Sequence, residues 1–456
     1  DRRFGRRQSL ESWEIMDNAR TISSRRVAMP DGIAPALLRL EDGLIQEVVP
    51  GDARGDLDFG DRLILPGLVD THVHVNEPGR TEWEGFASLT RAAAAGGVTT
   101  LIDMPLNSIP ATTTAAALEV KRRAADGRCH VDVGFWGGLI PGNVGKLAGL
   151  IAAGARGIKA FMVDSGVDEF PAVSPLEIEK ALGVLGPLCA PLLVHAEDPA
   201  LVAWQADRLR EAPCEHAAWA LSREGAEEAA VERLIDLAER CRAPIHVVHV
   251  STAGAVLRLR EARGKGVPIT GETCPHYLVL CGEDVPPGGT QFKCAPPLGC
   301  AQDREALWQG LLDGTLGMIV SDHSPCPPEL KELESGRFDL AWGGIASLQV
   351  SRAVVWTEAV RRGIPPIRVV EWMSTAPARL AGLAGRKGVI APGADADLMI
   401  IDPEARFVVD PARLEHRHRV TPWAGHELSG VVQATYLRGE LIHEEGRLST
   451  PTGRLL

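Results

Sequence analysis

Two histidines one residue apart, His72 and His74, end the strongly apolar run ILPGLVDTHVH (residues 64–74). Side chains two residues apart on a strand point the same way, so both imidazoles would project together from the end of a buried strand. Two neutral imidazoles that converge on one point form half of a metal site. A hydrogen-bonded pair of core histidines would give the same local sequence, so this pair alone leaves both interpretations open.

Further polar residues stand in or at the end of later apolar runs. They are Lys159 in ARGIKAFMV, His195 in PLLVHAE, His249 in PIHVVHVS and Asp322 in GMIVSDHSP. Each has an ordinary explanation by itself, such as a core histidine bonded to a carbonyl group or an aspartate that caps the next helix. Six such residues at the equivalent ends of successive strands favour one shared site.

The chemistry of this set suits metal ions. Four imidazoles and one carboxylate can hold two divalent cations, but a bridging anion is missing. A cationic Lys159 would repel metals, whereas a desolvated lysine that loses its proton could react with carbon dioxide and become a carboxylated, bridging lysine. Two metals can activate water and polarise a substrate carbonyl. Asp322 could then take a proton from the water and deliver it to a leaving nitrogen.

The pattern of elements predicts the scaffold. Eight apolar runs, each followed by a polar turn and most of them by an Ala-rich helical segment, predict a (β/α)8 TIM barrel over residues 64–385. An open doubly wound sheet is the competing architecture, but no glycine-rich dinucleotide loop follows the first run. The helical segments include residues 86–96, 112–125, 174–186, 225–240 and 253–266.

The two ends of the chain differ from the barrel in pattern. Short alternating runs broken by Gly and Asp fill residues 22–63 and return in residues 386–456, which predicts antiparallel strands. We expect these ends to pair into one small β-sandwich domain beside the barrel. Residues 1–21 are basic and lack an apolar signal region, and we expect a poorly ordered extension there.

Composition limits the class of function. The chain of 456 residues has 48 basic and 60 acidic residues, a formal net charge of −12, which argues against nucleic-acid partners and anionic membrane surfaces. No apolar run is long enough to span a membrane. Nine cysteines without a CxxC pair indicate reduced thiols and a cytoplasmic enzyme.

These residues resemble a known family, the cyclic amidohydrolases of the amidohydrolase superfamily, which includes dihydroorotases, hydantoinases (dihydropyrimidinases) and allantoinases. The resemblance covers residues 22 to 446. It implies that His72, His74, His195, His249 and Asp322 bind two divalent metal ions, most often zinc, with manganese, cobalt or iron as alternatives. It also implies that Lys159 is carboxylated and bridges them, that Asp322 is catalytic, and that the chain forms a dimer or tetramer.

Specificity within the family depends on other residues. Dihydroorotases carry an arginine two residues after the second histidine, where this chain has Asn76. A carboxamide cannot clamp a carboxylate as a guanidinium does, and it suits a neutral, amide-rich substrate. The segment DMPLNSIP, with Asn107, differs from the dihydroorotase motif in the same direction. We expect Asn76, Asn107, Gly343 and Gly344 to contact the substrate.

Several motifs together resemble allantoinases: NEPGRTEWEG (76–85), DMPLNSIP (103–110), FWGGLIPGN (135–143), SGVDEFP (165–171), VSDHSPCPPELK (320–331) and WGGIASLQ (342–349). The resemblance implies hydrolysis of the ring amide of allantoin, a neutral hydantoin with a ureido arm, to allantoate. A hydantoinase of wider range is the alternative, although KAFMVDSGVDEFP lacks the tyrosine expected after the lysine. A non-catalytic assembly homologue is a remote alternative, because such proteins lose metal ligands.

Four residues near the predicted site have open roles. Gly299 in KCAPPLG stands where this family usually has an arginine. That arginine either orients a loop or the substrate, or it has only a surface role. His246 is either filler of a polar strand, which we favour, or a supporting residue behind the ligands. We expect His323 to support the ligands from behind, and the role of His276 stays open.

Overall fold

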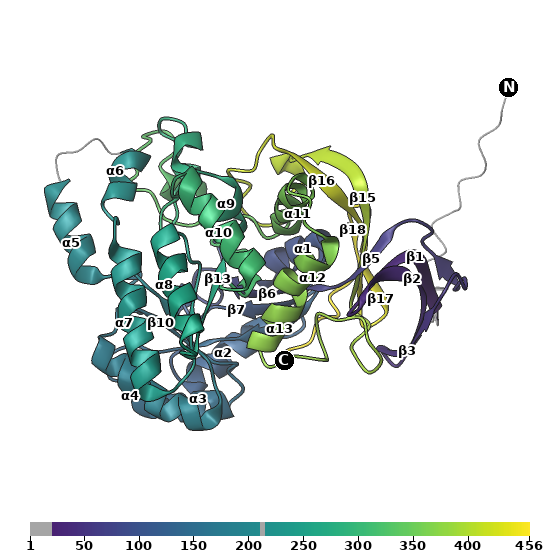
Figure 1. Cartoon of the computed structure of the whole chain (residues 1–456), viewed down its shortest axis with the longest axis horizontal. Coiled ribbons are helices and arrows are strands. Elements are labelled where there is room, and N and C mark those ends of the chain that lie inside the picture. Colours follow the sequence, from purple (N-terminus) through teal and green to yellow (C-terminus); the bar gives the residue numbers. More distant parts are fainter. Residues whose placement is uncertain (1–20, 210–214) are drawn as a thin grey trace.

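The computed structural model describes residues 21–209 and 215–456, which form a (β/α)8 barrel beside a mainly antiparallel sheet. In Figure 1 the barrel and its helices occupy the left, and the purple N-terminal strands lie near the yellow C-terminal strands on the right. The predicted fold, a barrel with a small β-domain built from both chain ends, is confirmed. The predicted disorder of residues 1–21 falls, except for Thr21, outside the described residues.

All eight predicted runs supply parallel barrel strands. The third strand is interrupted at Trp136 and appears as two short segments, β8 and β9. An isolated parallel bridge between Val73 and His323 joins the last strand to the first and closes the barrel. The strands are β6 (Leu68–Val73), β7 (Val98–Asp103), β8 (Asp132–Phe135), β9 (Gly137–Gly138), β10 (Ile158–Phe161), β11 (Leu192–His195), β12 (Ile245–Val247), β13 (Ile269–Thr273) and β14 (Met318–Ile319).

Helices surround the strands, and the predicted helical segments are confirmed. The start of α4 shows why the sequence folds this way, since Ser174 and Glu177 form a reciprocal capping box and a proline occupies the first turn. The barrel helices are α1 (Phe86–Gly96), α2 (Ala115–Ala125), α3 (Leu147–Ala152), α4 (Pro175–Leu185), α7 (Ala226–Cys241), α8 (Ala253–Gly264), α10 (Ala301–Asp313) and α11 (Ser351–Arg361). Further helices are α5 (Pro199–Arg208), α6 (His216–Leu221), α9 (Pro275–Val279), α12 (Pro366–Val370) and α13 (Ala376–Leu380).

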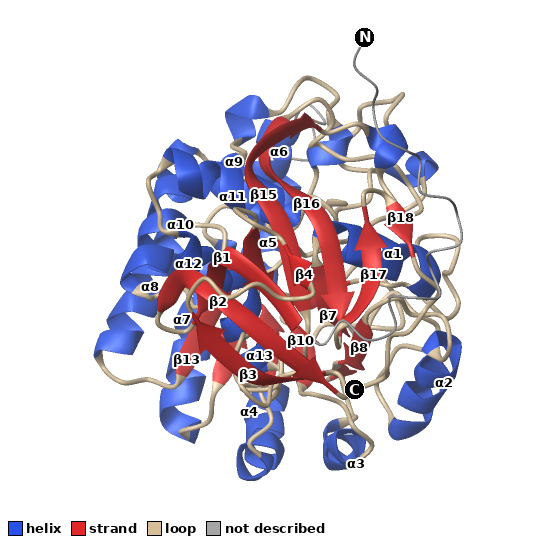
Figure 2. Ribbon diagram, turned by 90° about the vertical axis from the view of Figure 1, so that its right-hand side faces the viewer, coloured by secondary structure: helices blue, strands red, loops and turns tan. Residues whose placement is uncertain are grey.

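The chain ends form one nine-stranded sheet (Figure 2). Its order is β18-β17-β16-β15-β5-β1-β2-β3, with β4 paired to β1. Alternating side chains of these strands enclose a small apolar core of their own that includes Ile22, Leu38 and Leu398. The strands are β1 (Thr21–Met29), β2 (Gly32–Glu41), β3 (Leu44–Pro50), β4 (Leu57–Asp58), β5 (Leu63–Pro66), β15 (Leu398–Val408), β16 (Glu427–Leu437), β17 (Glu440–Glu444) and β18 (Arg447–Leu448).

The beginning of the barrel differs from the prediction. Residues 64–66 belong to β5, which pairs with β1 and β15 in the terminal sheet, and the first barrel strand begins only at Leu68. Gly67 separates the two strands, and a Cβ there would meet the Thr99 side chain at 2.2 Å. The run looks like one strand in the sequence because both parts are buried. The division into domains otherwise remains a prediction.

A buried ionic cluster joins the terminal sheet to the barrel. The ammonium group of Lys387 lies 2.7 Å from Asp132 on β8, 2.7 Å from Asp397 and 2.8 Å from Asp395. Arg438, at the turn between β16 and β17, donates to both carboxylate oxygens of Asp132 at 2.6 Å. Arg386 pairs with Asp395 at 3.2 Å, so three carboxylates face three cations, and removing Lys387 or Arg438 leaves a buried charge without compensation.

Two further properties concern membrane-spanning helices and the state of the cysteines. Within residues 21–209 and 215–456, no helix combines the length and the apolar character that crossing a membrane requires. The eight cysteines in the described part of the chain are all free thiols, and most of them are buried.

Replacing Lys387 by methionine is expected to lower the free energy of unfolding by about 3–5 kcal/mol, because three buried carboxylates lose their central cation. Urea unfolding followed by circular dichroism measures the change. The control is Arg26→Ala, which removes an exposed ion pair with Glu404 and is expected to cost less than about 1 kcal/mol. Equal stability of the two variants would contradict a structural role for the cluster.

Candidate active site

A cavity of about 280 Å³ opens where the barrel strands end. His72, His74, His195, His249 and Asp322 all line it, although up to 250 residues separate them in the sequence. Loops and the helix α6 supply much of the remaining wall, and the lining residues from these segments include Asn107, Asp164, Trp219, Arg223, Lys293 and Trp342. The barrel therefore brings the predicted histidines and the aspartate together.

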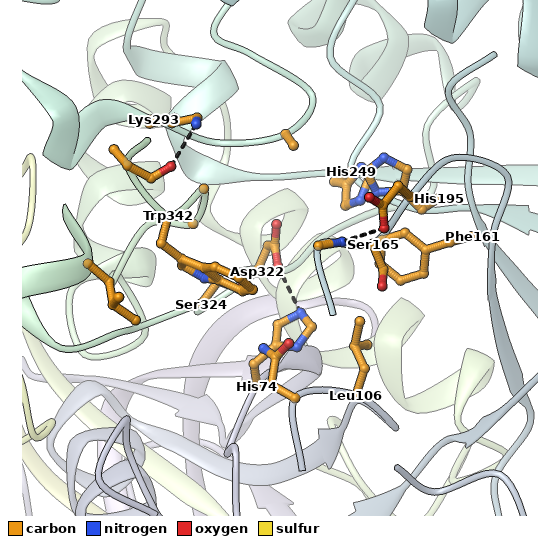
Figure 3. Close-up of a pocket in the computed structure, with 18 of the residues that line it drawn as sticks. His74, Leu106, Phe161, Ser165, His195, His249, Lys293, Asp322, Ser324 and Trp342 are labelled. Atoms are coloured by element: carbon orange, nitrogen blue, oxygen red, sulfur yellow. Dashed lines mark hydrogen bonds and ion pairs between the residues drawn. The ribbon is translucent and has the colours of Figure 1, made fainter. Parts of the chain in front are cut away.

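Asp322 faces the first histidine pair. Its Oδ1 atom lies 3.3 Å from Nε2 of His72 and 3.5 Å from Nε2 of His74. These three residues offer ligand atoms that all lie within 4.8 Å of one another. Figure 3 shows the ring of His74 and the carboxylate of Asp322 directed at each other. One divalent cation could accept ligands from this group.

His195 and His249 form the second pair. Their rings meet edge to face with centroids 4.6 Å apart, and the ring of His249 lies 5.5 Å from that of His72. The Phe161 ring stacks on His195 at 4.6 Å (Figure 3). The four imidazoles thus form one continuous group around the same space.

Lys159 lies on β10, fully buried beside this group. Its Nζ atom has no hydrogen-bond partner among the described residues and lies 4.7 Å above the centre of the Phe161 ring. Burial lowers the pKa of Lys159 to about 7, although Glu272 and Asp322 oppose the shift. A substantial fraction of this amine is therefore uncharged near neutral pH and able to act as a nucleophile.

Three of these histidines, His72, His195 and His249, have lowered pKa values, which favours the neutral imidazole. Burial, reinforced by neighbouring cationic groups, lowers the pKa of His72 and of His249 well below the usual value. The pKa of His195 is also lowered by burial, against the opposing effect of Glu197. Neutral imidazoles keep a lone pair available, which is the state that a metal ligand needs.

Two buried carboxylates orient the histidines from behind. Glu272 on β13 accepts a hydrogen bond from Nδ1 of His72 at 2.7 Å, which leaves Nε2 free to bind a metal. Glu197 accepts from Nε2 of His195 at 2.6 Å and is itself held by Arg223 at 2.8 Å. Sequence reasoning missed both carboxylates. Glu272 lies near the end of the seventh strand, so the rule that identified the other residues could have found it.

The other histidines have distinct positions. The interpretation of His246 as filler is wrong, because its Nε2 donates to Glu272 at 3.1 Å and thereby fixes the carboxylate that orients His72. His323 accepts at Nδ1 from two backbone amides and faces Glu84 at 3.6 Å, so it supports the end of β14. His276 is buried without a hydrogen-bond partner among the described residues and can place a ring nitrogen near Asp322.

The backbone is strained at two of these side chains. His249 and Asp322 have φ angles of 40° and 43°, in the left-handed region that residues other than glycine rarely adopt. Such conformations cost free energy, and they persist where the surrounding structure requires a particular side-chain direction. At both positions the left-handed backbone turns the side chain toward the shared space.

The predicted substrate contacts divide into two groups. Asn107, Gly343 and Gly344 line the cavity. Gly344 has a φ of 144°, and a Cβ there would meet the backbone oxygen of Ser324 at 2.5 Å, so this wall requires glycine. Asn76 is fully buried and is absent from the described cavity lining. The Oδ1 atom of Asn76 accepts a hydrogen bond from Nδ2 of Asn107 at 3.0 Å, and its own contact with a substrate stays a prediction.

The segment after Asn76 secures the surrounding loops. Arg80 donates to the backbone oxygen of Asn107 at 2.7 Å and pairs with Glu169 of the SGVDEFP segment. Trp83 packs edge to face on Trp342, which lines the cavity, with centroids 4.8 Å apart. The NEPGRTEWEG sequence therefore connects three loops of the cavity.

The altered position Gly299 lies away from the cavity. It is absent from the described lining, and its carbonyl oxygen accepts a hydrogen bond from Gly282 at 2.8 Å. A Cβ at this position would meet the Asp303 carboxylate at 2.6 Å. Asp303 caps the start of α10 and also holds the amide of Ala253. Glycine at position 299 thus leaves room for the Asp303 carboxylate that caps α10.

The donor set as a whole fits divalent metal ions. It combines neutral imidazoles, one carboxylate and a buried amine without a partner, with carboxylates behind the histidines as in many metal sites. A carbonyl group of a substrate bound in the cavity would face these candidate ligands, Asp322 included.

Comparisons with known proteins agree with this arrangement. The sequence model described as "Amidohydrolase family" matches residues 63–442. The allantoinase of Streptomyces avermitilis is 48% identical over 440 residues, covering 95% of this chain and 98% of its own. The allantoinase of Arabidopsis thaliana is 42% identical, covering 93% of this chain and 88% of its own.

Solved structures show the same architecture. The L-hydantoinase (dihydropyrimidinase) from Arthrobacter aurescens superposes with a TM-score of 0.91 at 29% identity, covering 95% of this chain and 99% of its own. The dihydropyrimidinase from Brevibacillus agri gives a TM-score of 0.89 at 28% identity, with 96% and 98% covered.

Replacing Glu272 by glutamine is expected to weaken metal binding about 10- to 100-fold, because an amide has one acceptor oxygen for two histidine N–H groups. Competition with a chromogenic chelator measures the affinity. Glu261→Gln, at an exposed position on α8, is the matched control and is expected to bind metal as the parent protein does. Unchanged affinity in Glu272→Gln would show that this carboxylate does not orient the ligand.

Proposed function

The chain belongs to the amidohydrolase family, and we propose that it hydrolyses the ring amide of allantoin to give allantoate. The observation that carries this proposal is the extended identity to allantoinases, which reaches 48% over nearly all of both chains. The family together with these relatives supports a hydrolase of cyclic amides. The agreement with allantoinases over whole chains distinguishes this substrate from the others that the family uses.

We assign six residues to a centre of two divalent cations, most often zinc, with manganese, cobalt or iron as alternatives. The ligands are His72, His74, Lys159, His195, His249 and Asp322. Lys159 is assigned as the bridge after carboxylation. The unpartnered, largely uncharged amine of Lys159 and the orienting carboxylates behind the histidines support this assignment.

In the proposed reaction Asp322 transfers a proton and the cavity residues contact the substrate. When bound, two such cations polarise a carbonyl group and lower the pKa of water. Asp322 takes the proton of the attacking water as the water oxygen bonds to the ring carbonyl carbon. It delivers this proton to the ring nitrogen as the carbon–nitrogen bond breaks. Asn107, Gly343 and Gly344 border the cavity and are proposed to contact the substrate.

A hydantoinase is the second candidate, and the solved hydantoinase structures favour it by fold. Their identity to this chain is 29% and 28%, well below that of the allantoinases. Neither Tyr277 nor Tyr436 is among the described cavity residues, so no tyrosine hydroxyl contacts a substrate there. A non-catalytic assembly role is disfavoured, since the metal-binding residue types are all present.

The cellular compartment and the oligomeric state are also proposals. We assign the protein to the cytoplasm, which the free thiols and the acidic composition support. A homo-oligomer, as a tetramer or a dimer, remains a prediction.

Metal-loaded protein is expected to open allantoin with a kcat/KM at least about 100-fold above that for hydantoin, dihydrouracil or dihydroorotate. The high identity to allantoinases carries this expectation, and the absence of an arginine two residues after His74 is a further reason against dihydroorotate. Parallel assays of ring opening at 25 °C, with metal content measured on the same samples, test this. Preferred turnover of hydantoin or dihydrouracil would replace the proposed function by the second candidate.

Carboxylation of Lys159 is expected to depend on pH. The reaction joins the neutral amine to carbon dioxide and releases one proton. Because burial lowers the pKa of Lys159 to about 7, the reactive form predominates above this pH and is lost below it. Carbon-13 NMR of metal-free protein with labelled bicarbonate should show a carbamate signal that falls between pH 8 and about pH 6.

Lys159→Ala is the control and should give no carbamate signal. The buried Lys121 should not contribute, because its ammonium pairs with Asp103 at 2.6 Å. A signal that persists in Lys159→Ala would show that another lysine is carboxylated.

A further inference from the structure

Asn76 and Asn107 form a directed chain of hydrogen bonds behind the cavity wall. The Nδ2 atom of Asn76 donates to the backbone oxygen of Pro325 at 3.3 Å. The Oδ1 atom of Asn76 accepts from Nδ2 of Asn107 at 3.0 Å. Asn76 follows His74 by two residues and Pro325 follows Asp322 by three, but of Asn76, Asn107 and Pro325 only Asn107 is among the described residues that line the cavity.

The direction of this chain follows from its first member. A backbone carbonyl can only accept, so Asn76 must present its amide nitrogen to Pro325 and its oxygen to Asn107. Asn107 in turn must donate with its own nitrogen. Its oxygen is then the only polar side-chain atom left, and no described residue donates a hydrogen bond to it.

The backbone of both asparagines is also fixed. Their φ angles are 64° and 51°, in the left-handed region where asparagine is tolerated better than most residues. Arg80 holds the carbonyl oxygen of Asn107 at 2.7 Å, and its own amide donates to the carbonyl oxygen of Asn76 at 3.1 Å. Rotation of the Asn107 carboxamide is therefore the remaining freedom, and Asn76 removes it.

We propose that Asn76 is a positioning residue that fixes the Asn107 carboxamide with its oxygen toward the cavity, so that the site selects ring substrates with an N–H donor there and disfavours a carboxylate. This inference rests on the proposed function and makes its recognition step specific. The ring and ureido groups of allantoin offer several N–H donors, whereas the carboxylate of dihydroorotate offers only acceptors. Two acceptors cannot share a hydrogen bond, and bringing them together without water costs free energy.

Glycine variants test the two residues separately, because glycine accepts both φ angles without steric cost. Asn107→Gly removes the acceptor, and kcat/KM for allantoin should fall about 10- to 100-fold. Asn76→Gly leaves the acceptor present but free to rotate, so the fall should be only about three- to tenfold. Metal content and the thermal midpoint of each variant report whether the site remains intact.

The decisive measurement is inhibition by dihydroorotate. In Asn76→Gly the Asn107 carboxamide can rotate and donate to the carboxylate, so the inhibition constant should fall at least about fivefold. Asn107→Gly and the double variant have no such donor, and their inhibition should stay as weak as in the parent protein. Asn76→Asp still accepts from Asn107 and should likewise show no gain.

A loss of allantoin turnover in Asn76→Gly without stronger inhibition would overturn the proposal and leave Asn76 with a structural role only. If Asn76→Gly fails to fold, Asn107→Gly decides, and an unchanged kcat/KM for allantoin in that variant would overturn the proposal. Failure of the proposed function is distinguishable. If the parent protein opens hydantoin instead of allantoin, inhibition of that activity by dihydroorotate still tests the direction of the Asn107 carboxamide.

Discussion

Closure of the barrel between its first and last strands is the contact on which the site depends. Asp70 accepts hydrogen bonds from the backbone amides of His72 and Ser321, and so joins β6 to β14. The amide of His74 donates to the carbonyl of His323 at 2.9 Å one step further along. These bonds place Asp322 beside a histidine pair that lies about 250 residues earlier in the sequence.

Burial then sets the chemistry of the groups that closure brings together. Water would keep a lysine charged and would compete with ligands for metal ions. Out of water, the pKa of Lys159 falls to about 7 and the pKa values of His72 and His249 fall well below the usual value. The cost of burying these polar groups is offset by carboxylates behind them, of which Glu272 serves two histidines at once. The proposed metal ligands and the carboxylates behind them therefore form one unit.

Substrate recognition also depends on polar groups that are held in one orientation. The proposed metal ligands lie on barrel strands or within three residues of their ends, whereas much of the remaining wall comes from loops held by Arg80 and by packing of Trp83 on Trp342. A rigid loop can present one face of an amide group, which distinguishes donors from acceptors. This separation explains how relatives can share one metal centre and differ in the ring that they open.

The sequence by itself determined the barrel, the helices and the candidate ligands, because strand and helix periodicity and the rule for strand ends are local in character. It could not separate β5 from β6, since both are buried, nor assign Glu272 and His246, whose roles depend on contacts across the barrel. It also placed Asn76 against the substrate. Only the tertiary structure shows Asn76 one step behind Asn107, because a hydrogen bond between distant loops has no signature in either segment alone.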